Sequence, residues 1–296
     1  MQNHWLVIGV LMGMLGVMSP KLVQGQSLPV LTPTTPQAVK YLGQGLQQAQ
    51  AGNIESAIAS FQEAIALDQN LAPAHYNLGL ALREQGNLQA AAEAFYRALS
   101  VDPNLAVASA NLGAALLEGN NLEQAQIYLD RALEISPELG IAHYNLGLVQ
   151  RQQGNLQPAI KHFQNAQQYQ PESPDVSYQL GLAYLAKKDL EQAKTAFEKT
   201  IRLNSRYSKA HYGLGQVWFQ QQKWDRALNA FQEASKYNSE LASAYYATGV
   251  VLFKQEKFQQ AQSQLQQAQR LYAAQEQEKW ATYAEQLAQR ALSRID

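Results

Sequence analysis

Hydrophobic residues between positions 72 and 105 recur at spacings of three and four, which is the periodicity of an amphipathic helix. The residues that set this pattern are Leu78, Leu82, Leu88, Ala91, Phe95, Ala98 and Leu99. The pair Gly86-Asn87 interrupts the pattern, and such a pair is typical of a turn. The segment therefore predicts two helices of about a dozen residues, joined by a tight turn.

The same pattern returns every 34 residues, and seven such units run from Ala38 to Gln275 without an insertion or deletion. The eighth residue of every unit is glycine, the twentieth is alanine, and the twenty-fourth is phenylalanine or leucine. One helical hairpin cannot bury both of its faces, so neighbouring hairpins must stack. The pattern predicts an all-α solenoid.

These units resemble the tetratricopeptide repeat (TPR) family, which has Leu-Gly, Ala, Phe, Ala and Pro at the same offsets. The resemblance implies a right-handed α-solenoid of seven helix-turn-helix repeats over residues 38–275. The sequence departs from the family pattern at the two ends, where Gln44 and Thr248 replace the leucine that precedes the glycine.

The residues after Gln275 predict a capping helix over residues 276–296. Its apolar positions at helical spacing are Trp280, Tyr283, Leu287, Ala288, Ala291, Leu292 and Ile295. The last repeat would otherwise expose an apolar face to water, so we expect this helix to cover it.

The N-terminal segment Trp5 to Met18 is apolar and uncharged. It is short for a membrane span of about 20 residues but suits the core of a signal peptide. We expect cleavage before Gln26, which would make residues 1–25 a signal peptide and the protein periplasmic or secreted. An uncleaved membrane anchor and a buried structural helix are the alternatives. Residues 26–37 are rich in Pro and Thr and predict an extended linker.

Composition and motifs exclude several classes of function. The 23 Lys and Arg residues balance 24 Asp and Glu residues, which is untypical of nucleic-acid binding. The chain has no cysteine, so disulfides, thiol catalysis and cysteine-ligated metals are excluded. Gly43-Gln44-Gly45 lacks the third glycine of a phosphate-binding loop, and no nucleophile motif is present. We therefore expect no enzyme activity, catalytic residue, cofactor or small-molecule substrate.

Three histidines occupy the fourth position of alternate units: His75, His143 and His211. Helices pack about 8–10 Å apart, so residues two repeats apart are separated by roughly 20 Å. Ligands of one metal ion must each lie within about 2 Å of it. We predict no metal site, and we expect each histidine to lie in the seam between the two helices of its repeat.

The resemblance to the TPR family also implies where a partner binds. In that family the first helix of each unit lines a concave groove, with its second, fifth, ninth and twelfth residues facing the ligand. The candidate groove residues are Tyr76, Leu80, Tyr144, Leu148, Arg151, Tyr178, Leu182, Tyr212, Phe219, Tyr246 and Phe253. Tyrosine is enriched at interfaces because it offers a large rigid ring and one hydroxyl. The alternative, that these tyrosines pack against neighbouring repeats, stays open.

Chaperone-binding members of the family grip a C-terminal carboxylate with Lys, Arg and Asn on three successive units. Only Asn77 matches this arrangement in units one to three, and only Lys209 in units four to six. We therefore expect no carboxylate clamp.

The function that these observations predict is a non-enzymatic adaptor that binds a protein or peptide segment in an apolar, tyrosine-lined groove. By analogy with exported family members, it would serve the assembly of envelope complexes. The alternatives are a self-assembling structural repeat protein, in which copies pair as a homo-oligomer, and a membrane-anchored helper of a membrane complex. The sequence does not identify the partner.

Overall fold

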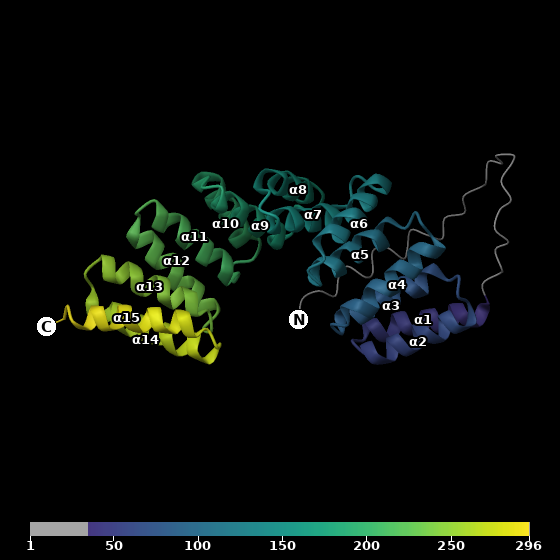
Figure 1. Cartoon of the computed structure of the whole chain (residues 1–296), viewed down its shortest axis with the longest axis horizontal. Helices are drawn as coiled ribbons and strands as arrows, with labels where there is room; N and C mark the ends of the chain where they lie inside the picture. The colour runs from purple at the N-terminus through teal and green to yellow at the C-terminus, as the bar shows by residue number, and fades with distance from the viewer. Residues whose placement is uncertain (1–34, 296) are drawn as a thin grey trace. The chain divides into compact units, whose positions relative to one another are not determined.

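The computed structural model describes residues 35–295, and all the regular secondary structure in this range is α-helical (Figure 1). The fifteen helices are α1 (Pro36–Gln50), α2 (Ile54–Leu67), α3 (Ala72–Glu84), α4 (Leu88–Val101), α5 (Ala106–Glu118), α6 (Leu122–Ile135), α7 (Gly140–Gln152), α8 (Leu156–Tyr169), α9 (Pro174–Ala186), α10 (Leu190–Leu203), α11 (Ser208–Gln220), α12 (Trp224–Tyr237), α13 (Ala242–Lys254), α14 (Phe258–Ala274) and α15 (Glu278–Leu292). Helices α1–α14 pair in sequence order, so each pair corresponds to one 34-residue unit.

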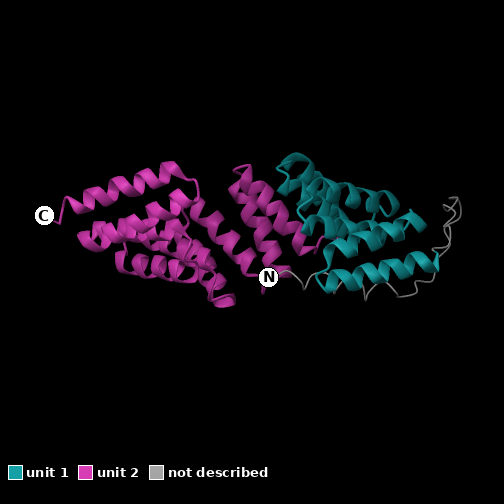
Figure 2. Ribbon diagram, turned by 90° about the horizontal axis from the view of Figure 1, so that it is seen from below, with its two compact units in different colours: residues 1–135 teal, residues 136–296 magenta. Residues whose placement is uncertain are grey.

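The chain divides into two compact units, Met1–Ile135 and Ser136–Asp296 (Figure 2). The first contains α1–α6, and the second contains α7–α15. Within each unit the two helices of a hairpin pack together, and the second helix packs against the first helix of the next hairpin. This arrangement confirms the predicted helical-repeat solenoid.

The invariant glycine at the eighth position of each repeat permits close contact between the paired helices. A Cβ atom on Gly181 would lie 2.5 Å from a ring carbon of Phe197, which is the twenty-fourth residue of the same repeat. Gly147 meets Phe163 in the same way. These phenylalanine rings are fully buried. The two positions that are most regular in the sequence therefore form one contact, repeated along the chain.

The turn inside each repeat places its fifteenth residue in the left-handed region of backbone space. Glycine occupies this place in three repeats, for example Gly86 with φ of 85°. Other residues occupy it in four repeats, for example Lys188 with φ of 64°. Left-handed backbone is unfavourable for residues with a Cβ atom, so the packing of the two helices must hold these turns.

Helix α1 begins at Pro36, two residues before the first residue of the expected repeat and inside the expected linker. The hydroxyl of Thr35 accepts a hydrogen bond from the backbone N–H of Ala38, so Thr35 caps the helix. Proline is well tolerated in the first turn, where its missing N–H has no helical partner. The sequence predicted a linker here because proline and threonine are also common in extended segments.

Helix α15 packs against α14 at the C-terminal end of the second unit. Its buried residues are Ala284, Ala288 and Ala291. Trp280 and Tyr283 remain 46% and 42% exposed, so they are less buried than a place on the packed face would make them, although Trp280 stacks on Tyr272 of α14. Small residues at spacings of three and four let α15 approach α14 closely, and the large side chains lie beside that contact.

The expected signal peptide and most of the expected linker lie outside the described residues. Among residues 35–295, no helix combines the length and the apolar character that a bilayer crossing requires.

Candidate protein-interaction surface

The fifth-position tyrosines of four repeats pack against the buried phenylalanine of their own repeat. The ring centroids lie 6.1 Å apart for Tyr144 and Phe163, and 5.4 Å apart for Tyr212 and Phe231. Each of these tyrosines is half-buried. One part of the ring therefore contributes to the core of the repeat, while another part reaches solvent.

Four fifth-position tyrosines lie in the second unit, on the first helices of successive repeats, and we call them the tyrosine row. Its members are Tyr144, Tyr178, Tyr212 and Tyr246. Burial raises the pKa of each of the four phenols. Their hydroxyl groups therefore stay neutral at physiological pH and keep a proton to donate.

The predicted ninth- and twelfth-position residues lie beside these tyrosines. Leu148 packs in the same hydrophobic cluster as Tyr144, and Leu182 packs in the cluster of Tyr178. Phe219 packs edge-on against Trp224, with ring centroids 5.2 Å apart. All three are half-buried like the tyrosines.

The remaining predicted residues are placed in the same way. Phe253 and Tyr246 share a cluster at the end of the second unit. In the first unit, Tyr76 and Leu80 share a cluster. Burial raises the pKa of Tyr76 to about 12.

Tyr246 differs from the other members of the row because its repeat has Leu265 where the others have phenylalanine. Its ring lies 6.4 Å from Tyr272 and 6.0 Å from Trp280, and Trp280 lies 5.7 Å from Tyr283. The row thus continues into α15 through residues that the sequence pattern did not assign to the binding surface. The regular spacing of the alanines in α15 was the signal that could have separated these aromatic residues from its packed face.

Arg151 lies at the centre of a polar group between repeats four and five. Its positive charge lowers the pKa of both Tyr144 and Tyr178, against the larger effect of burial. The side-chain amide of Gln179 hydrogen-bonds to the Tyr144 hydroxyl. The Tyr207 hydroxyl donates to Oδ1 of Asp175 at 2.7 Å. We call these six residues the Arg151 cluster.

Two atoms of the Arg151 cluster are buried without a hydrogen-bond partner among the described residues. They are Nε of Arg151 and Oε1 of Gln179. Such groups are unusual in folded proteins because an unmade hydrogen bond costs about 1–3 kcal/mol. Among the side chains of residues 35–295 with such an atom, Arg151 is the one that carries a charge.

The three repeated histidines each make the same structural contact. Nε2 lies 2.9 Å from the Gln69 carbonyl oxygen in the case of His75, and 2.9 Å from the Ser205 carbonyl oxygen in the case of His211. In both cases the carbonyl belongs to the loop six residues earlier. Each histidine thus ties the first helix of its repeat to the preceding loop.

His143 makes this contact with Pro137 at 3.0 Å and also faces a second histidine, His162, which the sequence analysis did not single out. The two residues are far apart in sequence and come from the two helices of one repeat. No group of three or more His, Cys, Asp or Glu side chains suited to a metal ion occurs among residues 35–295.

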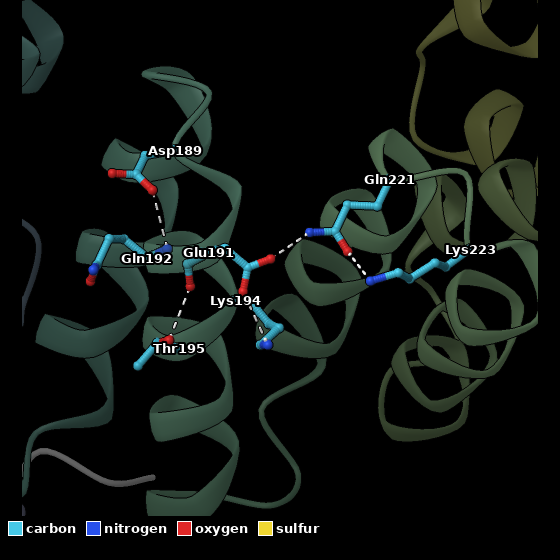
Figure 3. Close-up of polar contacts among 7 residues, drawn as sticks. All are labelled: Asp189, Glu191, Gln192, Lys194, Thr195, Gln221 and Lys223. Atoms are coloured by element: carbon cyan, nitrogen blue, oxygen red, sulfur yellow. Dashed lines mark hydrogen bonds and ion pairs between the residues drawn. The ribbon is translucent and has the colours of Figure 1, made fainter.

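A second polar group joins α10 to the turn after α11 (Figure 3). Nε2 of Gln221 donates to Glu191 at 2.9 Å, and Glu191 also pairs with Lys194. Gln255 and Asp225 occupy the same two positions one repeat later, and Gln255 donates to Asp225 at 2.8 Å. Because this contact recurs between successive repeats, we interpret it as a structural link between neighbouring hairpins.

Asn77, the one clamp-like residue of repeats one to three, donates to the carbonyl oxygen of Pro73 at 2.7 Å. Its amide is thus engaged with its own helix.

Comparisons with known proteins agree with this architecture. Family models described as "Tetratricopeptide repeat" match residues 72–105, 106–139, 140–173, 178–240 and 219–276, and a model described as "TPR repeat" matches residues 45–86. A comparison of the sequence with curated proteins gave no significant match.

Several solved structures share the fold. The crystal structure of the APC/C hetero-tetramer Cut9–Hcn1 is 20% identical with a TM-score of 0.66, and the match covers 73% of this chain and 43% of that chain. This chain therefore spans less than half of that protein. Pseudomonas aeruginosa pilF is 21% identical with a TM-score of 0.62, covering 69% of this chain and 92% of that chain.

YrrB, whose structure is described as that of a TPR protein with an unusual peptide-binding site, is 25% identical with a TM-score of 0.54. The match covers 66% of this chain and 99% of that chain. Repeats of this family support a protein-interaction scaffold, and its members are typically non-enzymatic. From its sequence and its helical hairpins, this chain belongs to the tetratricopeptide repeat family.

Proposed function

We propose that this protein is a non-enzymatic adaptor that binds a segment of a partner protein along the first helices of repeats four to seven. The observation that carries this proposal is the tyrosine row. Four successive first helices each present a half-buried tyrosine, beside half-buried residues such as Leu182 and Phe219. Rigid aromatic surface costs little conformational entropy on binding and gives a large contact area.

The chemistry of the row favours a peptide segment over a small molecule. Neutral phenol groups alternate with aliphatic side chains, so the surface offers hydrogen-bond donors to backbone carbonyls and apolar contacts to side chains. The likeness to YrrB, which is described as having a peptide-binding site, supports the same class of ligand. An exported location and a part in envelope assembly complete the proposal.

Site-specific photocrosslinking in cells tests the assignment of the surface. A photoreactive phenylalanine analogue would replace Gln216 or Phe219 on the first helix α11, and Lys161 or Glu198 on the second helices α8 and α10 as matched controls. We expect a protein partner to crosslink from the α11 positions alone. Equal crosslinking from Lys161 and Glu198 would contradict the proposal.

The location is tested separately. Mass spectrometry of the native protein should find Gln26 as the first residue. A chain that retains residues 5–18 in the membrane fraction would instead support a membrane-anchored helper.

Self-association is a second candidate, because α15 and the residues after it expose large apolar side chains. Leu292 is 48% exposed and Ile295 is 43% exposed, at the C-terminal end of α15 and just after it. Exposed apolar residues that gather at one end of a protein are typical of an interaction site. Light scattering would show a dimer that the double variant Leu292→Glu/Ile295→Glu abolishes. A monomer at all concentrations would reject this candidate.

A further inference from the structure

We infer that Arg151 binds the side-chain carboxylate of an Asp or Glu residue in the partner segment. This inference rests on the proposed function and specifies the chemistry of one position in the ligand. It is carried by a comparison between two equivalent arginines of this chain. Arg83 and Arg151 are both the twelfth residue of their repeats, in repeats two and four.

Arg83 has an acidic partner in the next repeat. Its Nε donates to Oε1 of Glu118 at 3.1 Å, and its guanidinium forms an ion pair with the same carboxylate. It also lies 3.4 Å from Oδ1 of Asn111. The guanidinium of Arg83 is therefore neutralised within the protein.

Arg151 lacks an acid at the equivalent position. The place of Glu118 is taken by Ala186, and the place of Asn111 is taken by Gln179. Arg151 forms no ion pair within 4.0 Å among the described residues, and its Nε has no hydrogen-bond partner. The acid of the cluster, Asp175, accepts a hydrogen bond from Tyr207 instead.

The unpaired guanidinium selects for a carboxylate. Arginine binds carboxylates through two parallel N–H···O hydrogen bonds, and these are about twice as strong as hydrogen bonds between neutral groups. The half-buried setting near Tyr144 and Tyr178 excludes part of the solvent and strengthens the attraction. The Arg83–Glu118 pair shows that this position of the repeat accommodates a carboxylate.

The residues around Arg151 favour an acidic side chain over a C-terminal carboxylate, because only Lys209 in repeats four to six matches the clamp that holds such a carboxylate. Leu148 lies on the same helix as Arg151, and Leu182 and Tyr212 lie on the first helices of the next two repeats. A segment that contacts this row would extend from Arg151 along the following repeats. The expected ligand is an apolar peptide with one acidic residue.

Selection of displayed random peptides on the purified protein tests the inference. We expect wild-type binders to share an Asp or Glu at one position. The Arg151→Gln variant should lose this preference, and the charge-reversed Arg151→Glu variant should select Lys or Arg there. A new preference of this kind cannot arise from misfolding. Arg83→Gln is the matched control and should keep the acidic preference.

A selected peptide then gives the size of the effect. Changing its acid to Asn or Gln should weaken binding to the wild type about 10-fold, and should change binding to Arg151→Gln little. A version with an amidated C-terminus should bind as well as the free acid. If only the amidated version fails, the ligand is a terminal carboxylate and the inference is wrong.

The outcomes separate this inference from the proposed function. Peptides that bind with no acidic preference, or with a preference that Arg151→Gln retains, would overturn the role of Arg151 and leave the peptide-binding surface intact. A complete lack of selected peptides, together with equal crosslinking from all positions, would contradict the proposed function itself.

Discussion

Nδ1 of His143 lies 3.2 Å from Nδ1 of His162, so two imidazole rings from the paired helices of repeat four share one hydrogen bond. His143 donates through Nε2 to the carbonyl oxygen of Pro137, which leaves its Nδ1 as an acceptor when the ring is neutral. His162 must then donate from Nδ1. If both rings were protonated, two N–H groups and two positive charges would face each other.

This pair predicts that the protein loses stability in mild acid. Burial lowers the pKa of His143, and burial together with the charges of His143 and Lys161 lowers the pKa of His162. Below the ordinary histidine pKa of 6.5, the unfolded chain binds protons that the folded chain does not. The free energy of unfolding should therefore be constant above that pH and fall as the pH decreases toward the folded pKa values.

Urea unfolding between about pH 7.5 and pH 5 measures this dependence. The His162→Gln variant should show a smaller loss of stability than the wild type over this range. His211→Gln is the control, since His211 has the repeat position of His143 and its own carbonyl partner but faces no second histidine in any contact described above. An unchanged pH dependence in His162→Gln would show that the pair does not carry the effect.

The glycine–phenylalanine contact predicts opposite effects for two Gly→Ala changes. Gly181→Ala would place a Cβ atom 2.5 Å from the Phe197 ring and should cost about 1–3 kcal/mol of stability. Gly43→Ala meets nothing within 4 Å and lies inside α1, so it should stabilise the protein by about 0.5–1 kcal/mol. Thermal unfolding measures both variants. If their melting temperatures shift in the same direction, the role of the glycine–phenylalanine contact is refuted.

The packing of the tyrosine row predicts that ring and hydroxyl can be separated by mutation. Tyr144→Ala removes the contact with Phe163 and should cost about 2–4 kcal/mol, somewhat less than for a fully buried ring. Tyr144→Phe keeps the ring and should unfold within about 1 kcal/mol of the wild type. Denaturant unfolding measures both. Equal losses for the two variants would mean that the hydroxyl, not the ring, holds the repeat together.

The cap of the second unit predicts a clear difference between two sides of α15. Ala284 is fully buried against α14, so Ala284→Arg should destabilise the protein by at least about 2 kcal/mol. Gln286 is exposed, and Gln286→Arg should change stability by no more than about 0.5 kcal/mol. If Ala284→Arg unfolds like the wild type, then α15 is not bound to α14 in solution.

Repeat period and residue type were sufficient to predict the hairpins. Seven phased copies of Gly, Ala and Phe define the helices, and small residues at fixed places require close packing. The end of the chain was less predictable. In α15 both the alanines and the aromatic residues fall at helical spacing, and periodicity alone does not say which set meets the neighbour. Trp280 and Tyr283 were therefore assigned to the packed face, whereas the structure leaves them partly exposed.

The candidate site shows the same division. Each tyrosine was predicted because it recurs at a fixed position of the repeat. Its ring contacts lie between two helices, so no single sequence position reveals them. The Arg151 cluster was only partly predicted, since Arg151, Tyr144 and Tyr178 were selected by repeat position, whereas Asp175, Gln179 and Tyr207 were not. Arg151 has no acidic partner because Ala186 occupies the position in the next repeat at which Glu118 pairs with Arg83.

The sequence by itself determined the helical hairpins, their number and their family, because these follow from short-range periodicity that repeats in phase. Only the tertiary structure decided which side chains face each other across the hairpins. The His143–His162 hydrogen bond joins residues from two helices, and whether Nε of Arg151 has a partner depends on residues of another helix. Hydrogen bonding and burial depend on distances in space, and these become defined only when the repeats stack.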